Sequence, residues 1–115
     1  MARKTVFEMP FASVYSALLQ KTERKGRTRA EVDEATAWLT GYTIEQIDES
    51  LASEITYGVF LSDSPAYNPR SELITGSVCG VKVEDIEDSM TKKMRQLDKL
   101  VDELAKRKPM EKVLR

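Results

Sequence analysis

A cluster of basic side chains near the end of the first predicted helix is the main candidate for a binding site. Its members fall within nine residues and are Lys21, Arg24, Lys25, Arg27 and Arg29. Such side chains can bind an anion or the phosphates of a nucleic acid. The cluster is more typical of a solvated corner, where bases complement the negative end of a helix dipole. Both interpretations stay open at this point.

Nucleic acid is not the expected partner of this cluster. No aromatic residue lies within the cluster, so no side chain there could stack on a base. The isoelectric point of about 5.6 is also far below that of a dedicated nucleic-acid-binding protein. Weak binding of an anion or a nucleic acid through residues 21–29 therefore ranks as an alternative function.

Four acids, Glu84, Asp85, Glu87 and Asp88, form the only candidate for a metal site. If this segment is helical, Glu84 and Asp88 share one face, and carboxylate oxygens suit hard divalent cations. No further acid at a suitable spacing completes a site, and acids are typical of the first turn of a helix. We therefore expect no metal ion here.

Cys79 is the single cysteine, and the chain has no histidine. Nucleophile systems of the Ser-His-Asp or Cys-His type are therefore excluded, as is zinc bound by histidine. Val78 and Val81 flank Cys79, which favours a small buried side chain over a reactive thiol. We expect no catalytic residue and no cofactor, while an enzyme based on carboxylates or on Cys79 stays an alternative.

Trp38 and Tyr42 lie on either side of Gly41 and off the apolar stripe of their helix. They suit either the edge of the core or an anchor for a protein partner. The spacing of Ala37, Gly41 and Ile47 is similar to that of a helix-turn-helix. The second helix of that pair carries three acids and no base between residues 43 and 53, which would repel DNA.

Apolar spacing and capping residues predict helical segments along most of the chain. The first begins at Pro10 and ends before Gly26, the second follows Thr28 and ends before Gly41, and the third follows Thr43. A short fourth helix follows Thr56. A long helix carries an apolar stripe from Met90 to Leu104, and a final turn from Met110 to Leu114 follows Pro109. Residues 73–83 read as a helix that gives way to a short extended stretch at 81–83, with Gly76 and Gly80 allowing another helix to approach.

The charges are segregated along the chain, although the formal net charge is only −1. Residues 21–29 carry five bases and one acid, and residues 89–115 carry nine bases and four acids. The stretch between them, 30–88, carries thirteen acids and two bases. Opposite charges of this kind can complement one another within the fold or across a homodimer.

The chain has 115 residues, of which 41% are apolar and 32% are charged. This composition predicts a single all-α domain over residues 1–115. The longest uncharged run, Met9 to Gln20, has 12 residues, whereas a membrane-spanning helix needs about 20. We therefore expect no membrane segment and a cytoplasmic location.

Short blocks in this order along nearly the whole chain resemble one family. The blocks are residues 11–15, 25–28, 31–33, 38–42, 68–69, 78–81, 83–88, 97–106 and 110–115. They resemble the family known as domain of unknown function 2200. The resemblance implies a compact, cytosolic, all-α bacterial protein, and it implies no activity, cofactor or catalytic residue.

These observations together predict a compact orthogonal bundle of about five or six helices around the long C-terminal helix. The leading functional expectation is a non-catalytic protein-interaction or binding module. Its partner is an unidentified protein or a second copy of the chain. The candidate binding residues are Lys21, Arg24, Lys25, Arg27, Arg29, Trp38 and Tyr42.

Overall fold

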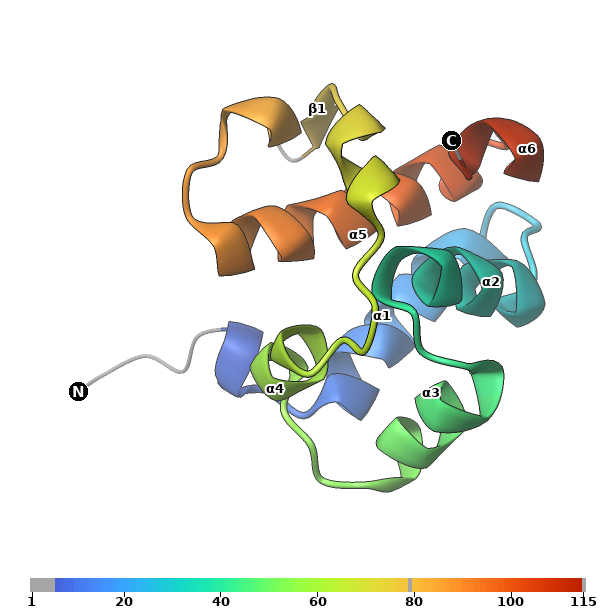
Figure 1. The fold of residues 1–115 in the computed structure, drawn as a ribbon. Coiled ribbons are helices and arrows are strands. Elements are labelled where there is room, and N and C mark those ends of the chain that lie inside the picture. Colours follow the sequence, from blue (N-terminus) through green and yellow to red (C-terminus); the bar gives the residue numbers. More distant parts are fainter. Residues whose placement is uncertain (1–5, 79, 115) are drawn as a thin grey trace.

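Six α-helices account for most of the fold (Figure 1). The computed structural model describes residues 6–78 and 80–114. The helices are α1 (Phe11–Glu23), α2 (Arg29–Thr40), α3 (Ile44–Ala52), α4 (Tyr57–Ser62), α5 (Ser89–Ala105) and α6 (Met110–Val113). Three 3-10 turns, η1 (Val6–Glu8), η2 (Pro69–Leu73) and η3 (Val83–Asp85), and an antiparallel pair, β1 (Ser77–Val78) and β2 (Val81–Lys82), complete the described part. The predicted helical fold is confirmed.

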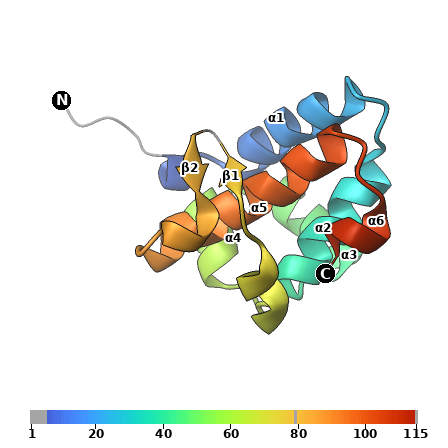
Figure 2. The ribbon, with the colours of Figure 1, turned by 90° about the horizontal axis from the view of Figure 1, so that it is seen from above.

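The long helix α5 is the element around which the others pack. It contacts α1, α2, α4 and α6, and β1 and η3 pack against it as well (Figure 2). Its stripe of Leu97, Leu100, Val101 and Leu104 is completely buried. Burial of apolar surface at about 25 cal/mol per Å² makes this stripe a principal source of stability.

Aromatic rings join α1 to α4. The ring of Phe11 stacks on that of Phe60 with 3.8 Å between centroids, and Tyr15 lies 5.1 Å from Phe11. The Tyr15 hydroxyl donates to Asp33 Oδ1 on α2 at 2.6 Å. A buried hydroxyl that donates to a carboxylate satisfies both polar groups, so α2 is tied to the aromatic cluster without an unpaired charge.

The predicted helix starts are confirmed in detail. Thr28 and Thr43 each accept a hydrogen bond from the backbone N–H three residues on, and the Glu31 and Gln46 side chains complete two capping boxes. Gly41 ends α2 with φ of +83°, a conformation that glycine adopts without steric cost. The local signals in the sequence therefore place α2 and α3 accurately.

The prediction of a helix within residues 73–83 is wrong. A 3-10 turn ends at Leu73, and the chain then forms the β1–β2 hairpin. Gly76 and Gly80 have φ of +102° and +78°, so they bend the chain at positions that a right-handed helix cannot use. Gly76 lies against the end of the Lys99 side chain from helix α5, whereas Gly80 has open space around it and receives no helix.

The acids at 84–88 do not share a helix face. Glu84 belongs to η3 and its Oε2 accepts from the Gly76 N–H at 2.9 Å. Asp88 is the N-cap of α5, with its side chain accepting from the Thr91 N–H. Hydrogen bonds lower the pKa of both carboxyl groups, from backbone N–H groups at Glu84 and from Thr91 at Asp88. These two acids stabilise turns and a helix start. Cys79 lies outside the described residues.

Candidate binding site

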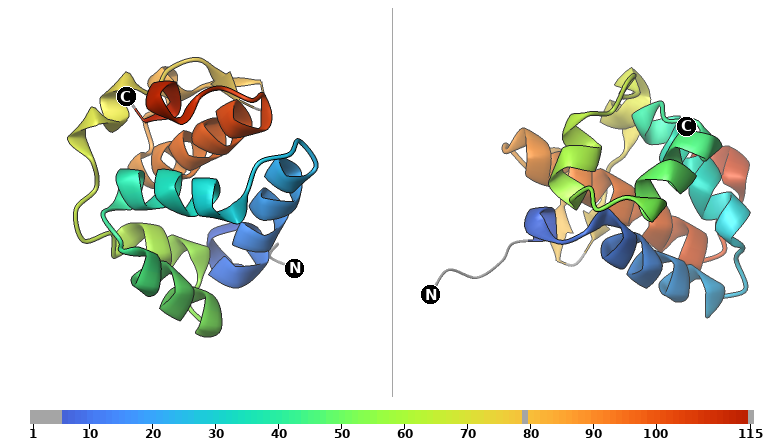
Figure 3. Two further views of the ribbon diagram at one scale, coloured as in Figure 1. Left: turned by 90° about the vertical axis from the view of Figure 1, so that its right-hand side faces the viewer. Right: turned by 90° about the horizontal axis from the view of Figure 1, so that it is seen from below.

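The structure brings two basic segments of the chain together at one end of the molecule. The end of α1 and the α1–α2 turn lie beside the end of α5 (Figure 3, left). Arg107 Nε donates to the Lys25 carbonyl at 3.4 Å across this junction. We call this region the basic corner and define it by the residues Lys21, Arg24, Lys25, Lys106 and Arg107.

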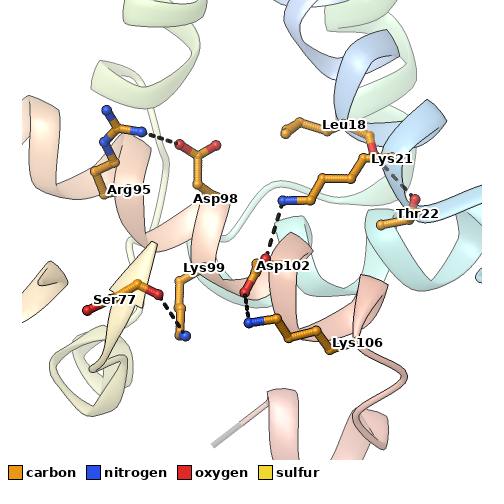
Figure 4. Close-up of polar contacts among 9 residues, drawn as sticks. All are labelled: Leu18, Lys21, Thr22, Ser77, Arg95, Asp98, Lys99, Asp102 and Lys106. Atoms are coloured by element: carbon orange, nitrogen blue, oxygen red, sulfur yellow. Dashed lines mark hydrogen bonds and ion pairs between the residues drawn. The ribbon is translucent and has the colours of Figure 1, made fainter. Parts of the chain in front are cut away.

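One carboxylate holds the base of the corner together. Asp102 Oδ1 lies 3.4 Å from Lys21 Nζ, and Asp102 Oδ2 lies 3.1 Å from Lys106 Nζ (Figure 4). Burial alone would raise the pKa of Asp102, but the hydrogen bonds and charges of Lys106 and Lys21 outweigh it and lower that pKa. A single negative charge therefore serves two cations, which leaves the corner with an excess of positive charge.

A shallow hollow of about 340 Å³ lies on the outer face of α1 at this corner. Its lining residues recur every three or four positions and are Ala17, Gln20, Lys21, Arg24 and Lys25. That spacing places them on one face of the helix and its continuation. Among the ion pairs within residues 6–78 and 80–114, none involves Arg24 or Lys25, so both cations are available to an anionic partner.

Arg27 and Arg29 have different surroundings from the other members of the predicted cluster. Arg27 Nη2 lies 2.8 Å from Glu31, and Arg29 Nε lies 3.3 Å from Asp33, so both pair with α2. The Arg29 guanidinium also pairs with Asp48 on α3. The i,i+4 spacing of these pairs is visible in the sequence and could have separated the two arginines from the cluster.

Two residues of the corner, Lys106 and Arg107, could not be assigned to it from the sequence. Arg107 lies 82 positions after Lys25, the residue whose carbonyl it contacts. Only the packing of α1 against α5 brings these segments together. By contrast, Ala17 and Gln20 lie within about one turn of Lys21, and helical periodicity alone could have identified them.

Trp38 and Tyr42 lie at the other end of α2 from the α1–α2 turn. The Tyr42 ring stacks on Phe60 with 4.5 Å between centroids, and its hydroxyl donates to the Phe60 carbonyl at 2.8 Å. Trp38 is half-buried against the core. Burial raises the pKa of Tyr42, with a further contribution from Asp63. The structure therefore gives Tyr42 a packing role and does not bring either aromatic to the basic corner.

A second cleft, of about 180 Å³, lies between η2 and the first turns of α5. Its lining residues are Tyr67, Ser71, Glu72, Ser89, Lys92, Lys93 and Gln96. Lys92 Nζ lies 3.8 Å from Glu72, and Lys93 Nζ lies 4.9 Å from the centre of the Tyr67 ring. Because each lysine already faces a partner within the fold, this cleft is a weaker candidate than the basic corner.

The described residues offer neither a metal cluster nor a membrane span. Across residues 6–78 and 80–114, no three His, Cys, Asp or Glu side chains come together in a way that could hold a metal ion. Within the same described ranges, no helix has both the length and the apolar character needed to cross a membrane.

Comparison with known proteins supports the resemblance noted from the sequence. The family model described as "Uncharacterized protein conserved in bacteria (DUF2200)" matches residues 5–115. A solved structure titled "Crystal structure of uncharacterized protein SP1917" is 45% identical, with a TM-score of 0.92, over 99% of this chain and 93% of that chain. No curated protein matches. The chain therefore belongs to the DUF2200 family of uncharacterised proteins conserved in bacteria.

Proposed function

We propose that the chain is a non-catalytic interaction module that binds an acidic segment of a partner protein through the basic corner. The observation that carries the proposal is the hollow of about 340 Å³, lined by Lys21, Arg24 and Lys25. A concave surface with available cations attracts carboxylates, and complementary charge directs both the approach and the register of a partner.

An acidic protein segment suits this corner better than a nucleic acid does. The hollow is lined by no aromatic side chain, so a base would have nothing on which to stack. The acidic α3 lies close by, since Arg29 at the start of α2 pairs with Asp48. Such acids repel a long polyanion that extends beyond the corner, whereas a short acidic segment can end before it reaches them.

A labelled oligoglutamate peptide tests the proposal by fluorescence anisotropy at low salt. We expect R24Q/K25Q to weaken binding by about twofold to thirtyfold, because two exposed charge pairs are lost and each contributes roughly 0.2–1 kcal/mol. The matched control is K92Q/K93Q, which removes the same charge from the second cleft and should leave binding nearly unchanged. Equal losses in both variants would show that net charge alone drives binding and would contradict a defined site.

A single-stranded oligonucleotide carrying the same label tests the alternative that the corner binds nucleic acid. We expect it to bind more weakly than the peptide at equal salt. If it binds more tightly and R24Q/K25Q abolishes that binding, the corner is a nucleic-acid site and the protein-partner proposal is wrong. Inorganic phosphate as a competitor separates recognition of an isolated anion from recognition of an extended segment.

A further inference from the structure

The helix α3 is unusually exposed for an element of so small a protein. Ile47 is its one fully buried residue, while Ile44 at the helix start is 42% exposed. The exposed side is acidic, and we call it the acidic edge, defined by Glu45, Asp48 and Glu49. The capping box of Thr43 and Gln46 holds the helix in place, so this edge is a fixed surface.

The placement of these acids serves the helix only in part, since Glu45 lies in the first turn, at the positive end of the helix dipole. Glu45 and Glu49 are like charges at i,i+4, a spacing that destabilises a helix, and Glu49 lies toward its negative end. Among the ion pairs of residues 6–78 and 80–114, Asp48 pairs with Arg29, and none involves Glu45 or Glu49. The two glutamates are therefore poised to interact with cations outside the chain.

The acidic edge and the basic corner are neighbours. In the left view of Figure 3, α2 runs from the α1–α2 turn toward α3 and so connects the two regions. Arg29, four residues after Lys25 and outside the basic corner, pairs with Asp48 of the acidic edge and so lies between the two patches. Adjacent patches of opposite sign are self-complementary, because a two-fold rotation about their boundary places each patch of one copy on the opposite patch of the other.

We propose that the partner of the basic corner is the acidic edge of a second copy of this chain, in a two-fold symmetric and salt-sensitive dimer. This inference rests on the proposed function and names its partner. In the dimer, Arg24 and Lys25 of each copy face Glu45 and Glu49 of the other. Because the dimer is two-fold symmetric, the contact between the basic corner and the acidic edge forms twice, and its contribution to the binding free energy is counted twice.

Sedimentation equilibrium of the full chain tests this inference. At about 0.05 M salt we expect a dimer whose dissociation constant rises at least about tenfold near 1 M salt, where the Debye length falls to about 3 Å. The charge reversals R24E/K25E and E45K/E49K should each raise the dissociation constant at least about tenfold, since each places like charges across the interface. Circular dichroism confirms that both variants remain folded.

Mixing the two variants gives the decisive measurement. R24E/K25E and E45K/E49K carry opposite patches, so an equimolar mixture should form a heterodimer with a dissociation constant within about threefold of the original. The control E87K/E111K reverses two acids elsewhere and should leave self-association nearly unchanged. A chain that stays monomeric at both salt concentrations, or a mixture no more associated than either variant alone, would overturn the inference.

The outcomes also separate this inference from the proposed function. A monomeric chain that still binds oligoglutamate through Arg24 and Lys25 would retain the interaction module and reject the second copy as its partner. A chain that neither dimerises nor binds the peptide would reject both.

Discussion

Asp98 and Asp102 lie one turn apart on α5 and have opposite electrostatic environments. Burial raises the pKa of Asp98. Arg95, whose Nη1 lies 3.3 Å from the carboxylate, and Lys21 act to lower that pKa, but their combined effect is smaller than that of burial. At Asp102, burial also acts to raise the pKa, but contacts with Lys106 and Lys21 outweigh it and lower the pKa. Ionisation of Asp98 therefore opposes folding, whereas ionisation of Asp102 favours it (Figure 4).

The pKa shifts of the two aspartates predict opposite effects of pH on the stability of the variants D98N and D102N. The folded pKa of Asp98 lies above the unfolded value of about 3.9, so its contribution to stability is lost as the pH rises through the folded pKa. D98N should therefore be at least as stable as the original chain at neutral pH. The contribution of Asp102 is present above about pH 3.9 and is lost as the pH falls, so D102N should cost roughly 0.2–1 kcal/mol per pair at neutral pH.

Urea unfolding of both variants at about pH 7 and about pH 3 measures these effects. The difference for D98N should shrink at low pH, because the raised pKa of Asp98 keeps that carboxyl protonated there. The difference for D102N should shrink less, because the lowered pKa of Asp102 lets it keep its charge to lower pH. A loss of stability in D98N that equals the loss in D102N at neutral pH would show that burial does not dominate the environment of Asp98.

At the scale of elements, the end of α2 depends on Gly41 for two reasons, its backbone conformation and its contact with a segment distant in sequence. The backbone N–H groups of Ala66 and Asn68 donate to the carbonyls of Thr40 and Leu39, which α2 itself leaves without partners. This segment crosses directly over Gly41, and a Cβ at position 41 would lie 2.7 Å from the Ala66 Cβ and carbonyl oxygen. Glycine is required there both for its φ and for space.

Two glycines with nearly equal φ separate these requirements. Gly26 has φ of +82° and no atom within 4 Å of the place that a Cβ would occupy, while Gly41 has φ of +83° and the Ala66 contact. G26A should cost about 1–2 kcal/mol, because an L-residue is strained in a left-handed conformation. G41A should cost a further amount of about 1–3 kcal/mol, because the 66–68 segment must move.

Denaturant unfolding of the two glycine variants gives the comparison directly. The difference between them measures the steric contribution of the 66–68 segment, since the backbone contribution is shared. Equal losses in G26A and G41A would mean that this segment moves aside at no cost and does not fix the end of α2.

For the whole molecule, the sequence predicts what depends on neighbours in the chain and misses what depends on packing. Thr28 and Thr43 predict the starts of their helices because each capping box lies within four consecutive residues. The hairpin near Gly76 is not apparent from the sequence because it is held by a distant contact with Lys99, whose Nζ donates to the Ser77 carbonyl at 3.1 Å. The same holds for the basic corner. Lys21 is a sequence neighbour of the other basic residues and could be predicted, whereas Lys106 reaches the corner only because α5 packs there.

The stability of the whole fold should depend on the buried side of α5 far more than on any exposed leucine. Leu100 is completely buried at the centre of that helix, whereas Leu73 at the end of η2 is 55% exposed. L100A should cost about 2–5 kcal/mol through lost burial and the cavity that remains. L73A removes the same atoms from a site that already contacts water, so its cost should stay within about 0.5 kcal/mol.

The consequence extends to every helix that α5 contacts. Because a domain of this size has only about 5–15 kcal/mol of net stability, L100A should lower the unfolding midpoint of the entire chain. Amide hydrogen exchange should then speed up together in α1, α2 and α5, while L73A should affect exchange only near η2. If L100A accelerated exchange in α5 alone, the helices would unfold separately, and α5 would not be the element that holds the bundle together.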